Sequence, residues 1–354
     1  MVTPKDPEPL LEVRDLTKHF PLYQPWLLGL ARQQVGTIAA VEGASFTIDR
    51  GETLGLVGES GCGKTTTARL ILRALRPTRG EILFRAGGAR VRVDQLEGKA
   101  LRALRPHIQM IFQDPFSSLN PRMPVGEIIG EPLRLHRYGT PAQIAERVKA
   151  LMGMVGLNVQ YLRRYPHSFS GGQRQRIGIA RALALSPELV VCDEPVSALD
   201  VSVQAQVLNL LKDLQAELGL TYLFISHNLA VIDYVASRIA VMYGGRIVEM
   251  ASKQALFESP KHPYTEALLA AVLRPDPKLR GTAGTAAVDG YGPAPWGPGC
   301  VYAARCPYVV ERCRVETPAL TAVTADHVAR CHRKDEISLT PLPRRGRRGA
   351  GTSP

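Results

Sequence analysis

The residues G-E-S-G-C-G-K-T at positions 58–65 have the spacing of a phosphate-binding loop. They follow an apolar run at 54–57 and precede a helical pattern that starts at Thr66, as such a loop requires. Backbone N–H groups then surround the phosphates, the lysine reaches the terminal phosphates and the next hydroxyl binds Mg²⁺. A chance glycine turn is the alternative, and it would need neither the strand nor the helix. The residues expected to contact phosphates or Mg²⁺ are Gly58, Ser60, Gly61, Gly63, Lys64, Thr65 and Thr66.

Two acidic residues follow a second apolar run, L-V-V-C at 189–192. Asp193 is expected to bind Mg²⁺, and Glu194 to act as the general base that polarises the attacking water. An acidic pair is common in loops, so this pattern alone says little. Combined with the phosphate loop, it predicts hydrolysis of a terminal phosphate.

A second glycine turn, S-F-S-G-G-Q at 168–173, opens another helical pattern. Such a turn presents bare backbone N–H groups and the positive end of a helix dipole to an anion. The phosphate loop already supplies one anion site, so this turn raises the question of which phosphate it meets. A helix N-terminus without a ligand is the alternative. The residues concerned are Ser170, Gly171, Gly172 and Gln173.

Four of the six cysteines lie near the C-terminus with the spacing C-x5-C-x6-C-x17-C. A reducing cytosol argues against disulfides, which leaves free structural thiols, a zinc site or an iron–sulfur cluster. Four thiolates suit either metal, but zinc modules usually hold cysteine pairs two to four residues apart. His327 and His332 are potential substitute ligands, although a surface role is simpler for the histidine beside Cys331. The cysteines are Cys300, Cys306, Cys313 and Cys331.

The elements that position these residues alternate between strand-like runs and helical patterns from about 10 to 248. Near-continuous apolar runs are typical of strands buried on both faces of an α/β sheet. Residues 21–38 look like an insertion between early strands. Strands are expected at 10–13, 44–48, 54–57, 108–112, 189–192, 222–225 and 239–242. Helices are expected at 141–154, 202–218 and 261–272.

The composition bounds the class of protein. With 354 residues, 45% of them hydrophobic, the chain can form one large core or two ordinary ones. No apolar run approaches 18 residues and the start M-V-T-P-K-D-P-E-P lacks an apolar core, so we expect neither a membrane span nor a signal peptide. The net charge of +12 would suit a nucleic acid, but the basic residues do not alternate with aromatic ones. We therefore expect no direct nucleic-acid contact.

Six motifs occur in the order seen in ABC-transporter ATPase subunits: the phosphate loop, Gln113, S-G-G-Q (170–173), V-V-C-D-E-P (190–195), S-A-L-D (197–200) and His227. The chain resembles more narrowly the ATPase subunits of oligopeptide/dipeptide importers. That resemblance rests on the phosphate loop, F-Q-D-P-F-S-S-L-N-P-R (112–122), K-H-P-Y (261–264) and G-C-V-Y-A-A-R-C-P (299–307), and it covers about 10–333. Phe169 stands where many ABC ATPases have leucine, which keeps an apolar side chain.

The resemblance implies an α/β fold, that of a P-loop NTPase with an ABC-type nucleotide-binding domain at 10–250. This domain would have a mixed sheet core and a helical subdomain at about 115–185. A C-terminal extension with the cysteine cluster is expected at 251–340. Within it, a Gly/Pro/Ala linker at 281–299 precedes the cysteine segment. A basic disordered tail is expected at 341–354.

The resemblance also implies roles for three single residues. Phe20 matches the aromatic residue that stacks on adenine, with a core phenylalanine as an equal alternative. Gln113 matches the glutamine that senses Mg²⁺ and the membrane partner; a solvated turn residue is the alternative, and the following D-P-F-S-S-L-N-P favours the functional role. His227 matches the histidine that contacts the γ-phosphate, and it directly follows a strand, where sites form.

The resemblance answers the question of the second turn. In this family Ser170, Gly171 and Gly172 close over ATP held by the phosphate loop of a second subunit, and Asp200 lies across the same interface. Each charge-assisted hydrogen bond would contribute about 1.5–3 kcal/mol. Two sandwiched ATP molecules could therefore supply the roughly 5.5 kcal/mol that switches a two-state equilibrium.

The implied function is that of an ATP-hydrolysing motor subunit for oligopeptide or dipeptide import. The implied cofactors are ATP, Mg²⁺ and a [4Fe–4S] cluster on the four C-terminal cysteines. Partners would be a second, paralogous ATPase subunit, two membrane permease subunits and an extracytoplasmic substrate-binding protein, with the chain peripheral on the cytoplasmic face of the inner membrane. The alternatives are another solute, such as nickel, or a soluble ABC-type ATPase that acts on nucleic acid.

Overall fold

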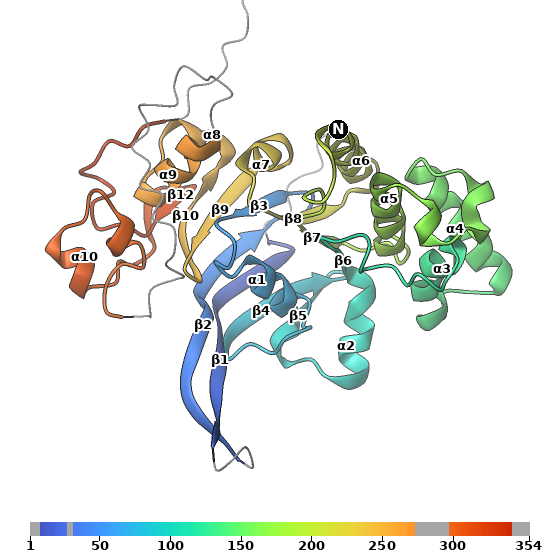
Figure 1. The fold of residues 1–354 in the computed structure, drawn as a ribbon, viewed down its shortest axis with the longest axis horizontal. Helices are drawn as coiled ribbons and strands as arrows, with labels where there is room; N and C mark the ends of the chain where they lie inside the picture. Colours follow the sequence, from blue (N-terminus) through green and yellow to red (C-terminus); the bar gives the residue numbers. More distant parts are fainter. Residues whose placement is uncertain (1–7, 27–30, 273–296, 342–354) are drawn as a thin grey trace, which may run out of the picture.

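The computed structural model describes residues 8–26, 31–272 and 297–341 (Figure 1). Most of the predicted linker and all but the first residue of the predicted basic tail lie outside these ranges. Within them the larger sheet has eight strands in the order β11-β12-β10-β9-β3-β8-β7-β6. Its parallel strands are buried, near-continuous apolar runs, as predicted. They are β3 (Thr53–Val57), β6 (Ile108–Ile111), β7 (Leu189–Asp193), β8 (Thr221–Ser226) and β9 (Arg238–Tyr243).

The register of the parallel strands aligns their carboxyl ends. Val57 pairs with Ser226, Asp193 pairs with Ile225, and Ile111 pairs with Cys192. Because parallel strands end at the same edge, the loops that follow them start side by side. This edge therefore receives the phosphate loop and the predicted residues that follow β6, β7 and β8.

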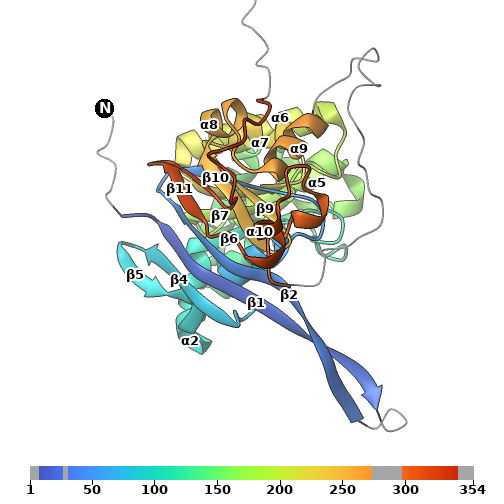
Figure 2. The same cartoon turned by 90° about the vertical axis from the view of Figure 1, so that its left-hand side faces the viewer.

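A second sheet is antiparallel, with the order β2-β1-β4-β5. The predicted insertion at 21–38 is instead part of a long hairpin, in which Pro21 pairs with Thr37 and Trp26 with Ala31. The hairpin projects from the body of the molecule in Figure 2. The prediction failed because it treated the apolar segments 10–13 and 44–48 as whole strands, whereas pairing continues through less regular sequence. The strands are β1 (Leu11–Trp26), β2 (Ala31–Ile48), β4 (Arg79–Ala86) and β5 (Ala89–Arg92).

The helices with the clearest local signals match their predictions. Helix α4 (Pro141–Met154) has Thr140 as its N-cap, with a hydroxyl that accepts from the backbone N–H of Gln143. Helix α6 (Val201–Leu218) ends at Gly219, which has φ = 65°. In the described residues no helix is long and apolar enough to cross a bilayer. The other helices and 3-10 turns before residue 240 are α1 (Lys64–Ile71), η1 (Val93–Gln95), α2 (Gly98–Leu104), η2 (Arg105–His107), α3 (Val125–Leu135), η3 (Val159–Arg163), η4 (Pro166–Ser168), α5 (Gly171–Ala182) and α7 (Leu229–Val235).

Helices α3, α4 and α5 form a separate layer beyond the β6 edge of the sheet (Figure 1). They pack through fully buried aliphatic side chains, including Ile129, Leu133, Leu151 and Ile177. Helix α3 was not predicted, because Pro132 lies inside it and interrupts a helical pattern.

The C-terminal residues add two strands to the larger sheet, because β12 pairs antiparallel with β10. This junction contains a fully buried carboxylate, Glu249. It accepts hydrogen bonds from the backbone N–H groups of Lys261 (2.7 Å) and His262 (2.8 Å), and it lies 2.7 Å from Nε2 of His327. Three segments that are distant in sequence are thus joined at one side chain. The elements are β10 (Arg246–Ser252), α8 (Lys253–Glu258), α9 (Pro263–Val272), η6 (Ala303–Arg305), α10 (Glu311–Val315), β11 (Thr321–Thr324) and β12 (His327–Ala329).

His262 is buried at the start of α9, and its Nδ1 accepts a hydrogen bond from the backbone N–H of Tyr264 at 3.1 Å. Burial, with a smaller contribution from the charge of Arg330, lowers the pKa of His262 to about 3. An unfolded histidine titrates near pH 6.5. Below that pH the unfolded chain binds a proton that the folded chain does not, so acid destabilises the fold.

We expect His262→Asn to flatten the pH dependence of stability, because asparagine keeps an acceptor near the Nδ1 position and does not titrate. In the wild type this histidine should remove up to about 1.4 kcal/mol of unfolding free energy for each pH unit below 6.5. Urea unfolding at several pH values between about 6 and 4.5 measures this slope. The exposed His167→Asn is the matched control. Equal slopes for wild type and His262→Asn would contradict the prediction.

Candidate functional site

The phosphate loop passes very close to two other segments of backbone. At Gly58, with φ = +155°, a Cβ atom would lie 2.1 Å from the carbonyl oxygen of Met242. At Gly63, with φ = +108°, it would lie 2.3 Å from the carbonyl oxygen of Ala40. Both contacts are far shorter than any side-chain carbon tolerates, so only glycine fits either position.

Lys64 is the first residue of α1, and its ammonium group points back into the loop. The side chain is buried, and Nζ donates to the carbonyl oxygens of Gly58 (2.8 Å) and Glu59 (2.9 Å). Gly63, the N-cap residue, has no side chain to accept from the first-turn N–H groups. A buried cation and uncapped N–H groups together form a site suited to phosphate.

Thr65 and Asp193 bring a hydroxyl and a carboxylate together beside the loop. Thr65 Oγ1 donates to Asp193 Oδ1 at 3.2 Å, and Asp193 is only 4% exposed. Burial raises the pKa of Asp193, and the hydrogen bond from Thr65 partly opposes that effect. Oxygen donors of this kind are the ligands that Mg²⁺ prefers, and a divalent cation would favour the ionised carboxylate. The pair therefore fits Mg²⁺.

Glu194 lies between residues from two other strand ends. Its Oε2 accepts a hydrogen bond from Gln113 Nε2 at 3.1 Å and lies 3.0 Å from Nδ1 of His227. The backbone of Glu194 has φ = 47°, and its N–H donates to the carbonyl oxygen of Ile225 at 3.0 Å. A left-handed conformation is strained for a residue with a side chain, and such strain concentrates at functional sites. The three predicted catalytic residues are thus brought together around one carboxylate.

The second glycine turn caps α5 through hydrogen bonds within the turn itself. Ser170 Oγ accepts from the backbone N–H of Gln173 (3.3 Å), and Gln173 Oε1 accepts from the backbone N–H of Ser170 (3.1 Å). A Cβ atom at Gly172 would lie 2.4 Å from Val203 Cγ1, so glycine lets α5 approach α6. Among the described residues, no hydrogen bond or ion pair joins 170–173 to 58–65.

Asp200 has a structural role that the sequence analysis missed. Its Oδ1 accepts from Ser202 Oγ (2.7 Å) and from the backbone N–H of Val203 (2.9 Å), which makes it the N-cap of α6. These hydrogen bonds, first that from Ser202, lower the pKa of Asp200. The pattern D-V-S at 200–202, directly before an apolar helical repeat, carried this signal.

Phe20 lies on β1 opposite Ile38, close in the hairpin to Ala40, whose carbonyl oxygen faces Gly63. Its ring is half-buried and belongs to neither hydrophobic core. The ammonium group of Lys18 lies 5.0 Å from the ring centroid. The ring is therefore placed near the phosphate loop with part of its surface open.

Comparison with known proteins agrees with this geometry. The family model for ABC transporters matches residues 41–197, and that for the oligopeptide/dipeptide transporter C-terminal region matches 248–313. The chain is 46% identical over 336 residues to the oligopeptide transport ATP-binding protein AppF of Bacillus subtilis (strain 168), a match that spans 94% of this chain and 99% of the relative. The chain belongs to the oligopeptide/dipeptide ABC transporter ATPases.

Two further relatives support membership of this ATPase family. The oligopeptide transport ATP-binding protein OppF of Haemophilus influenzae is 46% identical over 94% of this chain and 99% of its own length. A solved structure titled as the dimeric form of MJ0796, a bacterial ABC transporter cassette, has a TM-score of 0.59 at 26% identity and covers 68% of this chain and 98% of the cassette. The fold is therefore that of an ABC ATPase, as predicted.

The prediction of an iron–sulfur cluster in this ABC ATPase is wrong. In the described residues no group of three or more His, Cys, Asp or Glu side chains is arranged to hold a metal ion, which argues equally against the zinc alternative. The family models that match describe an ABC cassette and a transporter C-terminal region, and the relatives are described as ATP-binding proteins. All six cysteines are free thiols.

The environment of the cysteines explains the error. Cys300, Cys306, Cys313 and Cys331 do line one cavity, but its volume is about 10 Å³, room for one water molecule at most. Burial raises the pKa of Cys300 and Cys306, and raises that of Cys331 to about 11. The two histidines considered as substitute ligands have other partners, His327 at Glu249 and His332 at the carbonyl oxygen of Glu316.

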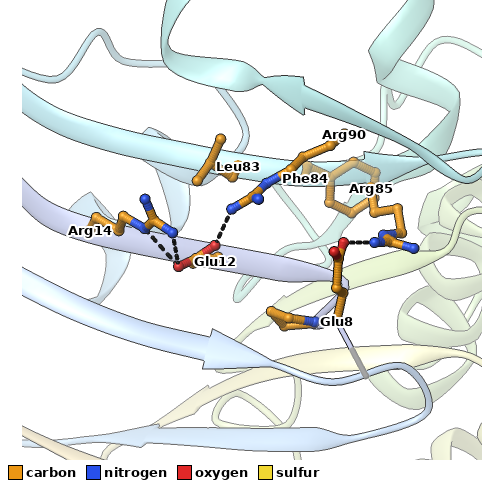
Figure 3. Close-up of a pocket in the computed structure, with 8 residues that line it drawn as sticks. Glu8, Glu12, Arg14, Leu83, Phe84, Arg85 and Arg90 are labelled. Carbon is orange, nitrogen blue, oxygen red and sulfur yellow. Dashed lines mark hydrogen bonds and ion pairs between the residues drawn. The ribbon is translucent and has the colours of Figure 1, made fainter. Parts of the chain in front are cut away.

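A separate cavity of about 210 Å³ lies on the antiparallel sheet (Figure 3). Its charged side chains pair with one another: Glu12 accepts from Arg14 (2.6 Å) and Arg90 (2.5 Å), and Glu8 pairs with Arg85. The lining residues lie on β1, β4, β5 and the residues before β1, and none of them belongs to the phosphate loop or to the group around Glu194. The cavity is therefore separate from the candidate site.

Two glycines of α5 give a matched test of how the second turn is positioned. Gly172→Ala should destabilise the fold by about 1–3 kcal/mol, because the new methyl group collides with Val203. Gly178→Ala in the same helix meets open space and should stabilise it by about 0.5–1 kcal/mol. Urea unfolding of both variants measures the difference. Equal effects would show that the approach of α5 to α6 does not depend on Gly172.

Proposed function

We propose that this chain is the ATP-hydrolysing motor subunit that powers import of oligopeptides or dipeptides through a membrane permease. The observation that carries the proposal is the position of the Glu194 carboxylate, held near Gln113 and His227 at the same sheet edge as the phosphate loop. The peptide cargo is supported by relatives named for oligopeptide transport and by the match over 248–313.

ATP would bind to the backbone N–H groups of the phosphate loop and to the ammonium group of Lys64, which already points into that loop. Phosphate oxygens would accept from the N–H groups of 58–65 and from the Lys64 ammonium group, which now bonds to the carbonyls of its own loop. Thr65 and Asp193 would hold Mg²⁺, which when bound neutralises phosphate charge. The half-buried Phe20 ring would stack on the adenine.

Hydrolysis would begin with the water molecule polarised by Glu194. As the water oxygen bonds to the γ-phosphorus and the bond to the bridging oxygen breaks, Glu194 takes the proton, and ADP and phosphate are the products. Gln113 donates a hydrogen bond to this carboxylate and so orients it. His227, whose side chain is 55% exposed, is accessible for contact with the γ-phosphate.

Two substitutions separate hydrolysis from binding. Glu194→Gln keeps the shape of the side chain but cannot accept the proton, so ATP should still bind while turnover falls by about 100-fold or more. Lys64→Ala should weaken ATP binding. The exposed Glu217→Gln on α6 is the charge-matched control and should hydrolyse ATP at the wild-type rate. Steady-state turnover and equilibrium ATP binding measure these effects, and normal turnover by Glu194→Gln would overturn the assignment.

We further propose that the working unit pairs this chain with a second, paralogous ATPase subunit on two permease subunits, at the cytoplasmic face of the membrane. An extracytoplasmic binding protein would deliver the peptide. Support comes from the turn 170–173, which among the described residues makes no hydrogen bond or ion pair to the phosphate loop of its own chain, and from a similar cassette whose solved structure is dimeric. In such a pair Ser170, Gly171 and Gly172 would meet ATP bound to the partner, and Asp200 would lie at the interface.

A cross-link can test this arrangement in the intact transporter. Ser170→Cys carrying a short photoreactive label should react, when ATP and Mg²⁺ are present, with the phosphate loop of a second subunit identified by mass spectrometry. The same label at the exposed Glu217→Cys should not reach that loop. A cross-link into 58–65 of the same chain, or no ATP-dependent product, would contradict the proposal.

A further inference from the structure

The C-terminal residues contact the phosphate loop directly, through the hydroxyl of Tyr264. The backbone N–H of Glu59, the second residue of the loop, donates to Tyr264 Oη at 2.8 Å. Tyr264 belongs to the K-H-P-Y stretch at the start of α9, and only 1% of its surface is exposed. The peptide carbonyl of Glu59 accepts from Lys64 on the other side. This residue of the loop is therefore held from two directions.

A second contact reaches the side chain of the same loop residue. Arg305, which ends the η6 turn beside Cys306, places Nη1 and Nη2 at 2.8 and 3.0 Å from the two carboxylate oxygens of Glu59. Its guanidinium carbon also lies 5.8 Å from the ring centroid of Tyr243 and 5.9 Å from that of Tyr302. The ion pair is partly exposed, so it supports the buried Tyr264 contact and does not replace it.

Tyr264 is itself fixed by aromatic packing and by the buried junction at Glu249. Its ring centroid lies 4.5 Å from that of Tyr243 and 5.4 Å from that of Tyr302. The backbone N–H of Tyr264 donates to His262, whose own N–H donates to Glu249. A continuous set of contacts thus runs from the sheet extension at β12 through α9 to the loop. Figure 2 faces this side of the molecule, where α9, α10, β9 and β10 lie together.

The glycine content of the loop makes such outside contacts important. Gly58, Gly61 and Gly63 all have positive φ, and glycine backbones lose the most conformational freedom when they are ordered. If the loop is already ordered in the free protein, less conformational entropy is lost when phosphate binds. Removing the Tyr264 hydroxyl would also leave the Glu59 N–H without its hydrogen-bond acceptor.

We propose that Tyr264 is a positioning residue for the ATP site, with Arg305 as its second contact, so that the C-terminal extension sets ATP affinity by holding the phosphate loop at Glu59. This inference rests on the proposed function, because it takes 58–65 as the ATP-binding loop. Neither residue touches the reacting atoms, so the effect falls on the affinity for ATP and leaves the chemical step largely unchanged.

Tyr264→Phe in the intact transporter tests the proposal, because it keeps the aromatic ring and removes only the hydroxyl. We expect the KM and Kd for ATP to rise about fivefold, with kcat changed by less than about twofold, as for the loss of one hydrogen bond. Hydrogen exchange at the Glu59 amide should accelerate. Tyr222→Phe is the matched control: Tyr222 is equally buried, but its hydroxyl donates to Leu211 O at 3.0 Å, away from the loop. It should leave ATP affinity at the wild-type value.

Arg305→Ala gives a second test at a partly exposed site, should Tyr264→Phe fail to fold. It should raise the KM for ATP about two- to threefold, and Arg305→Lys should restore part of the loss. ATP affinity within twofold of wild type in Tyr264→Phe, or in Arg305→Ala if only that variant folds, would overturn the inference. Lys64→Ala separates failure of this inference from failure of the proposed function: if that change leaves ATP affinity at the wild-type value, the proposed nucleotide site fails, and this inference fails with it.

Discussion

Four neighbouring parallel strands, β6, β7, β8 and β3, keep their hydrogen-bond register in step, so that all of them end at one edge of the sheet. The residues that directly follow these four strands therefore lie next to one another at that edge. This is why Gln113 and His227, which are distant in sequence, both contact the carboxylate of Glu194, and why Asp193 reaches Thr65. A one-residue shift of any strand would turn its terminal side chain to the opposite face and separate the group.

Backbone contacts impose the second constraint on the site. The phosphate loop lies against carbonyl groups of β2 and β9 at distances that exclude any side chain at Gly58 and Gly63. The antiparallel hairpin belongs to a different sheet from the parallel strands, but it also helps to shape the loop. Tyr264 and Arg305, from the C-terminal extension, contact the same loop, so segments that precede and follow the parallel strands both hold it in place.

The parts of this molecule that could be predicted from sequence are those with strong local causes. Strands buried on both faces are apolar runs, and α4 begins at Pro141 because Thr140 caps it. The position of 58–65 between a strand and a helix, and of Asp193 at the end of β7, could be predicted from the apolar runs that precede them. The outer part of the β1–β2 hairpin and the interrupted helix α3 have weaker local patterns and depend on pairing and packing. The contact between Glu59 and Tyr264 spans 205 positions, and no local sequence pattern predicts it.

The cysteine spacing was misleading, because it carries no information on burial or on the shape of the cavity.

The left-handed backbone at Glu194 has a consequence for protein engineering. Glycine or asparagine would adopt φ = 47° with less strain, at a gain on the order of 1 kcal/mol. A redesign guided only by stability would therefore select against the glutamate and remove the proposed general base. Stability and activity therefore conflict at this position. The proposed hydrolysis requires the carboxylate, whereas the left-handed backbone conformation favours glycine or asparagine.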